Sequence, residues 1–423
     1  MNENMYPYMN VNMRPPVKKS GFGSGMLAGA IIGVSATIFL LVFILNIFYD
    51  AGFVHIGTGG EIYVQDTAIL GDEGIGSAVE EKLNTLDSLM DSFLMEDADK
   101  EKAEENIYKA YLASYGDKYT VYYTPEEYKE LIESTTGRFY GIGAVCQKNE
   151  DGTILISDAY ENAPAYAAGI RDGDSIIKVD GRDITDMDLS SAVALIKGDK
   201  GTSVHLEVIR DGNSFEVDVI RDEIKAKTVD YTMREDNIGY ISISQFDDVT
   251  TEQFKTAVKD LNSQGMAGLI IDIRDNPGGV LTTVVDMLEY ILPDGMIVYT
   301  EDKNGKRIEY KGSDNNELTI PAAVLVNGNS ASASEIFAGA VQDYGIGKII
   351  GTETYGKGIV QTIKPLTDGS AVKFTIAKYY TPKGQDIHGK GVTPDIVVDL
   401  TKDDNEDVQM KAAVEYLLGE IKK

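Results

Sequence analysis

Residues 268–291 read GLIIDIRDNPGGVLTTVVDMLEYI, and this run decides the fold class. It opens with an apolar strand at 268–274, turns through Asp-Asn-Pro-Gly-Gly at 275–279, and continues as a helix to Ile291. A second unit of the same kind follows, in which a strand at 322–326 precedes a Ser/Ala-rich turn and another helix. Strands that alternate with helices predict a layered α/β core.

The pattern extends on both sides of these two units. A strand-like stretch at 238–246 and a helical stretch at 251–264 come before them. After them come short strands at 348–351, 360–365 and 372–379, and then an amphipathic helix at 408–421. We therefore assign residues 223–423 to one α/β core with a C-terminal packing helix.

Composition excludes several classes of protein. The chain has 423 residues, which predicts two or three domains at roughly 150 residues each. Its net charge of −29 argues against a nucleic-acid binder, which needs a basic surface, and we expect no nucleic-acid partner. One cysteine, Cys146, excludes an intrachain disulfide, and three histidines exclude a His-rich metal site. We expect no metal and no cofactor.

An apolar segment at 25–49 contains no charged residue and is long enough to cross a bilayer. Arg14, Lys18 and Lys19 precede it, which predicts a cytoplasmic tail at 1–24 and an extracytoplasmic remainder. The alternative is a cleaved signal peptide, but no A-x-A site ends the run. We therefore expect a single-pass, uncleaved signal anchor that holds the protein at the cell membrane.

The next two segments connect the predicted anchor to the globular part. Residues 50–75 are glycine-rich and weakly periodic, which is typical of a linker. Residues 76–132 have a helical pattern, with apolar positions at three- and four-residue steps, and a Thr-Pro start at 124–125 predicts the last helix. Together with the C-terminal helix, these helices could form a homodimer.

Residues 133–222 change to short strands and turns. Asp-Gly pairs at 151–152, 180–181 and 211–212 predict tight turns between strands. Tyr140-Gly141-Ile142-Gly143, Ala-Gly-Ile at 168–170 and Gly-Asp at 173–174 follow one another in an order that resembles a PDZ domain. That resemblance implies that the loop containing Tyr140, Gly141, Ile142 and Gly143 binds a peptide's terminal carboxylate, while the peptide adds a strand to the sheet.

The turn after the strand at 322–326 carries a candidate nucleophile. It reads Ser-Ala-Ser-Ala-Ser-Glu at 330–335, and a serine at a helix N-terminus lies where free N–H groups favour negative charge. The residues alone leave open which of the three serines acts, and a simple helix cap is the alternative. The glycines at 278–279 lie in a similar turn, so the two turns could jointly form an oxyanion hole.

A serine nucleophile needs a base, and the sequence offers two candidates. His388 lies in a glycine-punctuated loop, and Lys357 lies between two glycines. A lysine acts as a base only when burial or a nearby cation lowers its pKa enough to make it neutral. Gln361 lies four residues after Lys357, which places both on one face of the following strand.

These motifs, in this order, resemble the C-terminal processing peptidases, also called tail-specific proteases. The resemblance rests on the runs at 275–279, 324–327, 330–335, 355–358 with Gln361, and 389–395. It implies a crotonase/Clp-protease-like core and a serine endopeptidase that cleaves protein or peptide substrates near their free C-termini. It also assigns a role to individual residues: Ser332 as nucleophile, Lys357 as general base, Gln361 as the residue that orients the lysine, Gly278 and Ala333 as oxyanion donors, and Glu335 as a structural acid.

Two other functions fit parts of the sequence. A PDZ scaffold on an inactive protease core would bind peptide tails without cleaving them. A crotonase-like acyl-transfer enzyme would share the core but has no use for a PDZ-like insertion. The complete set of Ser332, Lys357 and Gln361 favours the peptidase.

Overall fold

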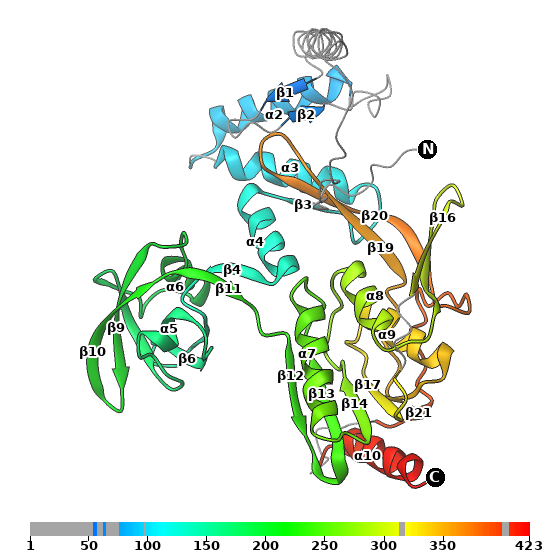
Figure 1. Ribbon diagram of the computed structural model, residues 1–423. Helices are drawn as coiled ribbons and strands as arrows, with labels where there is room; N and C mark the ends of the chain where they lie inside the picture. Colours follow the sequence, from blue (N-terminus) through cyan, green and yellow to red (C-terminus); the bar gives the residue numbers. More distant parts are fainter. Residues whose placement is uncertain (1–53, 57–61, 65–75, 97–98, 313–317, 400–405) are drawn as a thin grey trace, which may run out of the picture. The chain divides into compact units, whose positions relative to one another are not determined.

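The run at 268–291 forms the strand, turn and helix that its sequence predicts. β14 (Gly268–Asp272) enters the turn and α8 (Leu281–Glu289) leaves it. The computed structural model describes residues 54–56, 62–64, 76–96, 99–312, 318–399 and 406–423, which fall into two units, 1–99 and 100–423. Within the second unit, β14 lies in the middle of a six-stranded sheet of order β12-β13-β14-β17-β18-β21 (Figure 1).

The other strands of this core sheet are β12 (Val229–Met233), β13 (Ile238–Ile243), β17 (Ala322–Val326), β18 (Gly347–Gly351) and β21 (Ile396–Val397). All neighbours pair in parallel except β12 and β13. Every residue of β14 and β17 is buried. Parallel strands covered on both faces read as continuous apolar runs, which explains why these two were predictable.

Helices cover both faces of the core sheet. They are α7 (Thr250–Ser263), α8, α9 (Ala333–Tyr344) and α10 (Val408–Ile421), and the one-turn η2 (Glu235–Asn237) precedes β13. Ile271 and Val324 pack into the cluster that contains Phe337 of α9, whereas Ile270 packs into a second cluster with Leu417 of α10. Alternate residues of one strand therefore serve opposite faces.

A second sheet of order β16-β15-β20-β19 lies beside the core (Figure 1). Its strands are β15 (Gly295–Asp302), β16 (Arg307–Gly312), β19 (Ile359–Pro365) and β20 (Ala371–Tyr380). β15 and β16 were not predicted from the sequence. A further strand, β3 (Val121–Tyr123), pairs with β20 and lies between two predicted helices of the segment at 76–132.

The helical segment otherwise forms α2 (Ser77–Phe93), α3 (Lys100–Ala113) and α4 (Pro125–Thr136). The predicted start of α4 is confirmed, because Thr124 and Glu127 form a reciprocal capping box ahead of the proline. No residue of α2 is buried, and its apolar side chains are exposed. The homodimer stays a prediction.

Residues 144–220 form the small β-rich domain. Its sheet has the order β10-β9-β7-β6-β5, with β8 beside β7. The elements are β5 (Ala144–Lys148), β6 (Ile154–Ala159), α5 (Pro164–Ala167), β7 (Ser175–Val179), β8 (Arg182–Asp183), α6 (Leu189–Ile196), β9 (Ser203–Arg210) and β10 (Asn213–Ile220). All three predicted Asp-Gly turns connect consecutive strands of this sheet. β4 (Arg138–Gly141) pairs with β11 (Asp222–Lys225) where the chain enters and leaves the domain.

The predicted fold class was wrong in one respect, the transmembrane helix. Among the described residues, no helix is long and apolar enough to cross a bilayer. The longest described helix, α2, has 17 residues and carries several charges, whereas a span needs about 20 apolar residues. The segment at 25–49 and the tail at 1–24 lie outside the described residues, and the localisation inferred from them stays a prediction. Within the expected linker, β1 (Val54–Ile56) pairs with β2 (Ile62–Val64).

Candidate active site

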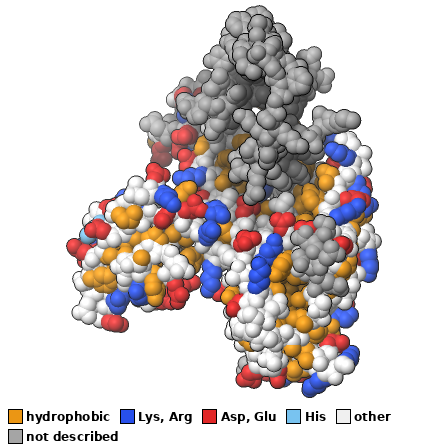
Figure 2. Space-filling model, viewed as in Figure 1, with side chains coloured by type: hydrophobic (Ala, Val, Ile, Leu, Met, Phe, Trp, Pro, Cys, Tyr) orange, Lys and Arg blue, Asp and Glu red, His pale blue; other side chains and the backbone are white. Residues whose placement is uncertain are grey.

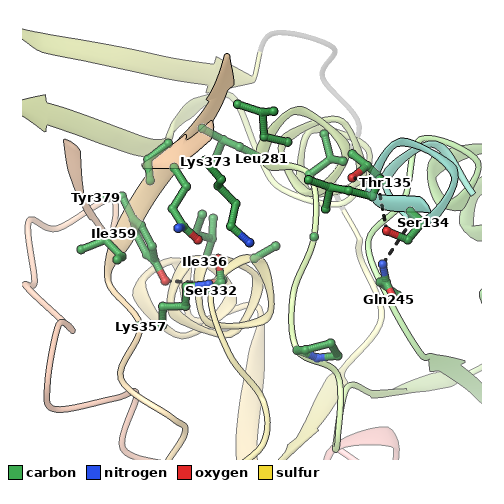
Figure 3. A pocket seen from close by; sticks show the side chains of 18 residues that line it. Ser134, Thr135, Gln245, Leu281, Ser332, Ile336, Lys357, Ile359, Lys373 and Tyr379 are labelled. Atoms are coloured by element: carbon green, nitrogen blue, oxygen red, sulfur yellow. Dashed lines mark hydrogen bonds between the residues drawn. The ribbon is translucent and has the colours of Figure 1, made fainter. Parts of the chain in front are cut away.

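A cavity of about 380 Å³ opens between the turn before α9, the turn before α8 and the strands β19 and β20. The predicted residues Ser332, Ala333, Lys357 and Gln361 all line it. Figure 3 shows Ser332, Lys357 and Tyr379 on one side of the cavity, and Ser134, Thr135 and Gln245 on the other. The structure thus brings together residues from three separate predicted motifs.

Ser332 is held in an uncommon backbone conformation at the start of α9. Its φ is +55° and its ψ is −112°, a region that non-glycine residues rarely adopt. The Tyr379 hydroxyl donates to the Ser332 carbonyl at 2.9 Å, and the Ser332 N–H donates to a Glu335 carboxylate oxygen at 2.9 Å. Such strain persists where surrounding contacts over-determine it, and it occurs frequently at active sites.

The two neighbouring serines have structural roles. The Ser330 hydroxyl donates to the Ile273 carbonyl at 2.8 Å, and the Ser334 hydroxyl donates to the Asn276 carbonyl at 2.8 Å. Both side chains are fully buried, and neither residue lines the cavity. Of the three serines that the sequence left open, only Ser332 faces the cavity.

Glu335 is fully buried and connects the serine turn to the lysine loop. One carboxylate oxygen accepts from the Thr354 hydroxyl and from the Gly356 N–H at 2.7 Å. The other accepts from the Lys357 N–H at 2.8 Å and from the Ser332 N–H. A single carboxylate therefore holds the backbone of both Ser332 and Lys357 in place, and this is the structural role that Glu335 has in the site.

The turn at 275–279 lies directly against the serine turn. A Cβ atom on Gly278 would come within 2.6 Å of the Ala331 carbonyl oxygen and within 2.9 Å of the Ala333 nitrogen. The φ of Gly278 is +104°, so glycine is required for both conformation and space. The Gly278 N–H donates to Asn276 Oδ1 at 2.9 Å, and an oxyanion would have to share or replace this bond.

Lys357 lies in surroundings that disfavour its charged form. Burial lowers the pKa of its ammonium group, and the positive charges of Lys373 and Lys118 lower that pKa further, whereas Glu335 opposes them. The ammonium lies 5.0 Å from the centre of the Tyr119 ring. Within the described residues, no hydrogen bond joins Lys357 Nζ to Ser332 Oγ, although both residues line one cavity.

The other candidate residues are placed differently from the sequence expectation. The Gln361 amide donates to the carbonyl of Tyr119, just before β3, at 2.8 Å, and no hydrogen bond joins Gln361 to Lys357 among the described residues. The Nδ1 atom of His388 is buried without a hydrogen-bond partner among the described residues, and His388 does not line the cavity. Of the two candidate bases, Lys357 lines the cavity and His388 does not.

Sequence reasoning missed several residues of this site, among them Tyr119, Lys373 and Tyr379. Lys373 and Tyr379 both lie on β20 and line the cavity, and Tyr119 lies just before β3. Lys373 and Tyr379 are separated by an even number of residues, which places them on one face of β20 but is only a weak sign of a shared site. Nothing in the local sequence connects residue 119 with residue 361. These contacts depend on the pairing of β3 with β20, which is set by tertiary structure.

The predicted peptide-binding loop leads into an edge strand. Tyr140 and Gly141 belong to β4, and Ile142 and Gly143 form the loop before β5. The Ile142 carbonyl accepts from Ala165, and a Cβ on Gly143 would come within 2.2 Å of the Ala163 side chain. β5 is the last strand of its sheet and packs beside α6, so its outer edge has the geometry for an added strand.

Comparison with known proteins identifies the family of the core and of the small domain. The family model for peptidase family S41 matches residues 237–398, and a PDZ-domain model matches residues 155–210. The carboxy-terminal processing protease CtpA of Bacillus subtilis is 36% identical over 365 residues, which cover 86% of this chain and 77% of that protein. The chain belongs to peptidase family S41.

Two further proteins are similar to this S41 peptidase. A probable CtpA-like serine protease of Staphylococcus aureus (strain N315) is 35% identical over 78% of this chain and 67% of its own length. The solved photosystem II D1 C-terminal processing protease is 30% identical over 74% of this chain and 86% of its own, with a TM-score of 0.44. The chain is a C-terminal processing serine protease with a PDZ domain.

Proposed function

We propose that this S41 peptidase cleaves its substrates by a serine–lysine mechanism, with Ser332 as nucleophile and Lys357 as general base. One observation carries the proposal. Of the three serines at 330–334, only Ser332 lines the cavity, and the same cavity holds a lysine whose pKa is lowered. A neutral amine can accept a proton from a hydroxyl, whereas an ammonium cannot.

The proposed reaction has two halves. Lys357 Nζ takes the proton of Ser332 Oγ while the oxygen attacks the scissile carbonyl, and the Ala333 and Gly278 N–H groups stabilise the oxyanion. Lys357 then gives that proton to the leaving amine, and an acyl-enzyme forms on Ser332. Water, deprotonated by the same lysine, hydrolyses the ester and restores the serine.

Substrate binding has to complete the site. The Gly278 N–H donates to Asn276, and no hydrogen bond joins the serine and lysine side chains among the described residues. Catalytic hydrogen bonds are often long in unliganded enzymes and tighten only in the complex. We propose that a bound peptide brings Lys357 Nζ toward Ser332 Oγ, with Gln361 as the neighbour that orients the amine.

The PDZ domain supplies the proposed docking site for the substrate's C-terminus. The N–H groups of the loop at 140–143 would bind the terminal carboxylate, and the tail would pair with the free edge of β5. Main-chain pairing gives affinity for many sequences, which suits a protease that selects for a free C-terminus. The presence of a PDZ domain also favours a peptidase over an acyl-transfer enzyme.

Ser332→Ala is expected to lower kcat by roughly 10⁴-fold or more, and Lys357→Ala by a similar factor, because each removes one half of a unit that acts together. The measurement is cleavage of casein and of a quenched fluorescent peptide by the full chain. Ser263→Ala and Lys364→Ala, which change exposed residues outside the cavity, serve as matched controls. Substantial cleavage by either site variant would contradict the mechanism.

The activity of the wild-type protein should depend on pH in a defined direction. Because the base must be neutral, kcat/KM falls about tenfold per pH unit below the pKa of Lys357 and reaches a plateau above it. Burial and the charges of Lys373 and Lys118 lower that pKa, so the plateau should begin below the usual range of a lysine. A rate that is constant down to acidic pH would exclude a lysine base.

A further inference from the structure

The active-site cavity differs in charge from the rest of the protein. The chain carries a net charge of −29, and Figure 2 shows Lys and Arg side chains interspersed with Asp and Glu over the visible face. In contrast, the described residues that line the cavity include two lysines, Lys357 and Lys373, and no carboxylate. A substrate entering the cavity therefore meets positive charge only.

Lys373 is the lysine that the proposed mechanism does not use. It lies on β20 opposite Ile363 of β19, is half-buried, and has its ammonium 5.2 Å from the centre of the Tyr123 ring. No carboxylate among the described residues lies within ion-pair distance of it, whereas Lys378 on the same strand pairs with Asp386 at 3.5 Å. Lys373 is thus a partly desolvated cation without an internal counter-ion, facing the reaction site.

In the proposed mechanism, the charge of Lys373 dominates the electrostatics of the cavity. Lys357 is neutral when it acts as a base, so Lys373 is then the remaining full charge of the described lining. A half-buried cation gains from a charged partner because such a hydrogen bond is stronger than one with a neutral group. The protein supplies no such partner, but a bound peptide can.

We infer that Lys373 determines specificity by binding a carboxylate of the substrate close to the scissile bond. The inference rests on the proposed function, because it places the peptide at Ser332. The ligand chemistry is a carboxylate, which comes either from an Asp or Glu side chain beside the cleaved bond or from the α-carboxylate of a short tail. Lys373 would therefore favour acidic sequences, in addition to the selection for a C-terminus by the PDZ domain.

The test compares matched peptides within each variant of the full chain. One pair carries Glu or Gln at successive positions around the cleaved bond, and a second pair ends in a free carboxylate or in an amide. All rates are measured on the alkaline plateau of each variant, where Lys357 is neutral. For the wild type we expect that in one of these pairs the peptide with the carboxylate has a kcat/KM about tenfold higher than its neutral counterpart.

Lys373→Met should bring that ratio close to one. Lys373→Glu should reverse the preference, so that a peptide with Lys at the same position is cleaved faster than the peptide with Glu. Lys364→Met, which changes an exposed lysine of β19 outside the cavity, should keep the wild-type ratio. The pair that responds to Lys373→Met identifies the source of the carboxylate. Equal rates on all pairs, or a ratio that survives Lys373→Met, would overturn the inference.

This outcome is separable from a failure of the proposed function. If Ser332→Ala abolishes cleavage and the ratio does not depend on Lys373, the mechanism stands and the inference is wrong. If Ser332→Ala still cleaves the peptides, the proposed function is wrong, whatever the ratios are.

Discussion

Gly278→Ala is expected to lower kcat/KM by roughly 10²- to 10³-fold, the cost of losing one oxyanion donor. The added methyl group would come within 2.6 Å of the Ala331 carbonyl oxygen and 2.9 Å of the Ser332 Cβ. The turn that carries Ser332 and the turn that carries Gly278 must therefore move apart, and this displaces the Gly278 N–H from its position in the oxyanion hole. The φ of +104° adds a backbone cost for any residue with a Cβ.

A control variant separates the backbone strain of an alanine at positive φ from the loss of the Gly278 N–H as an oxyanion donor. Gly265 also has a positive φ, +85°, but a Cβ there would meet no atom within 4 Å. Gly265→Ala should destabilise the fold by about 1 kcal/mol and leave kcat/KM unchanged. If Gly278→Ala loses no more activity than Gly265→Ala, then this turn does not form the oxyanion hole.

Glu335→Gln is expected to reduce kcat by roughly 100-fold or more and to destabilise the fold by about 2–5 kcal/mol. Each carboxylate oxygen accepts two hydrogen bonds, and the amide nitrogen that replaces one of them would face two donors. The buried N–H groups of the serine turn or of the lysine loop then lose their acceptor. The alignment of Ser332 with Lys357 should fail even though neither catalytic side chain is changed.

Urea denaturation and peptide cleavage measure the two effects separately. Glu353→Gln, which changes an exposed residue shortly before the lysine loop, is the matched control and should behave as wild type. The activity has to be measured at a temperature and urea concentration where the Glu335→Gln protein is folded. Full activity of that folded variant would show that the carboxylate does not position the site.

The elements that could be predicted from the sequence are those determined by residues close together in the chain. The apolar runs of β14 and β17, the Asp-Gly turns of the PDZ domain and the capped start of α4 each depend on residues close together in the chain. The turns that carry Gly278 and Ser332 were predictable for the same reason, since each follows a buried strand. Local patterns of this kind determine element type well.

The missed features depend on contacts between distant segments. β3 lies in the short stretch between two predicted helices, which carried no strand prediction, and only its pairing with the distant β20 makes it a strand. The same pairing places Tyr119 beside Gln361 and Lys357. No spacing in the sequence indicates that Lys373 shares a cavity with Ser332. The residues of the turn do not by themselves distinguish Ser332 from its two buried neighbours, and only the family resemblance pointed to it.

In the proposed mechanism Ser332 forms the acyl-enzyme and Lys357 activates the serine. The most direct measurement is to incubate the full chain with an activated peptide ester, quench it in acid, and locate the adduct by peptide mass spectrometry. We predict an adduct on Ser332 that is absent from Ser332→Ala and at least about 100-fold slower to form in Lys357→Ala. An adduct on Ser330, Ser334 or any other residue, or one that forms equally fast without Lys357, would contradict the account.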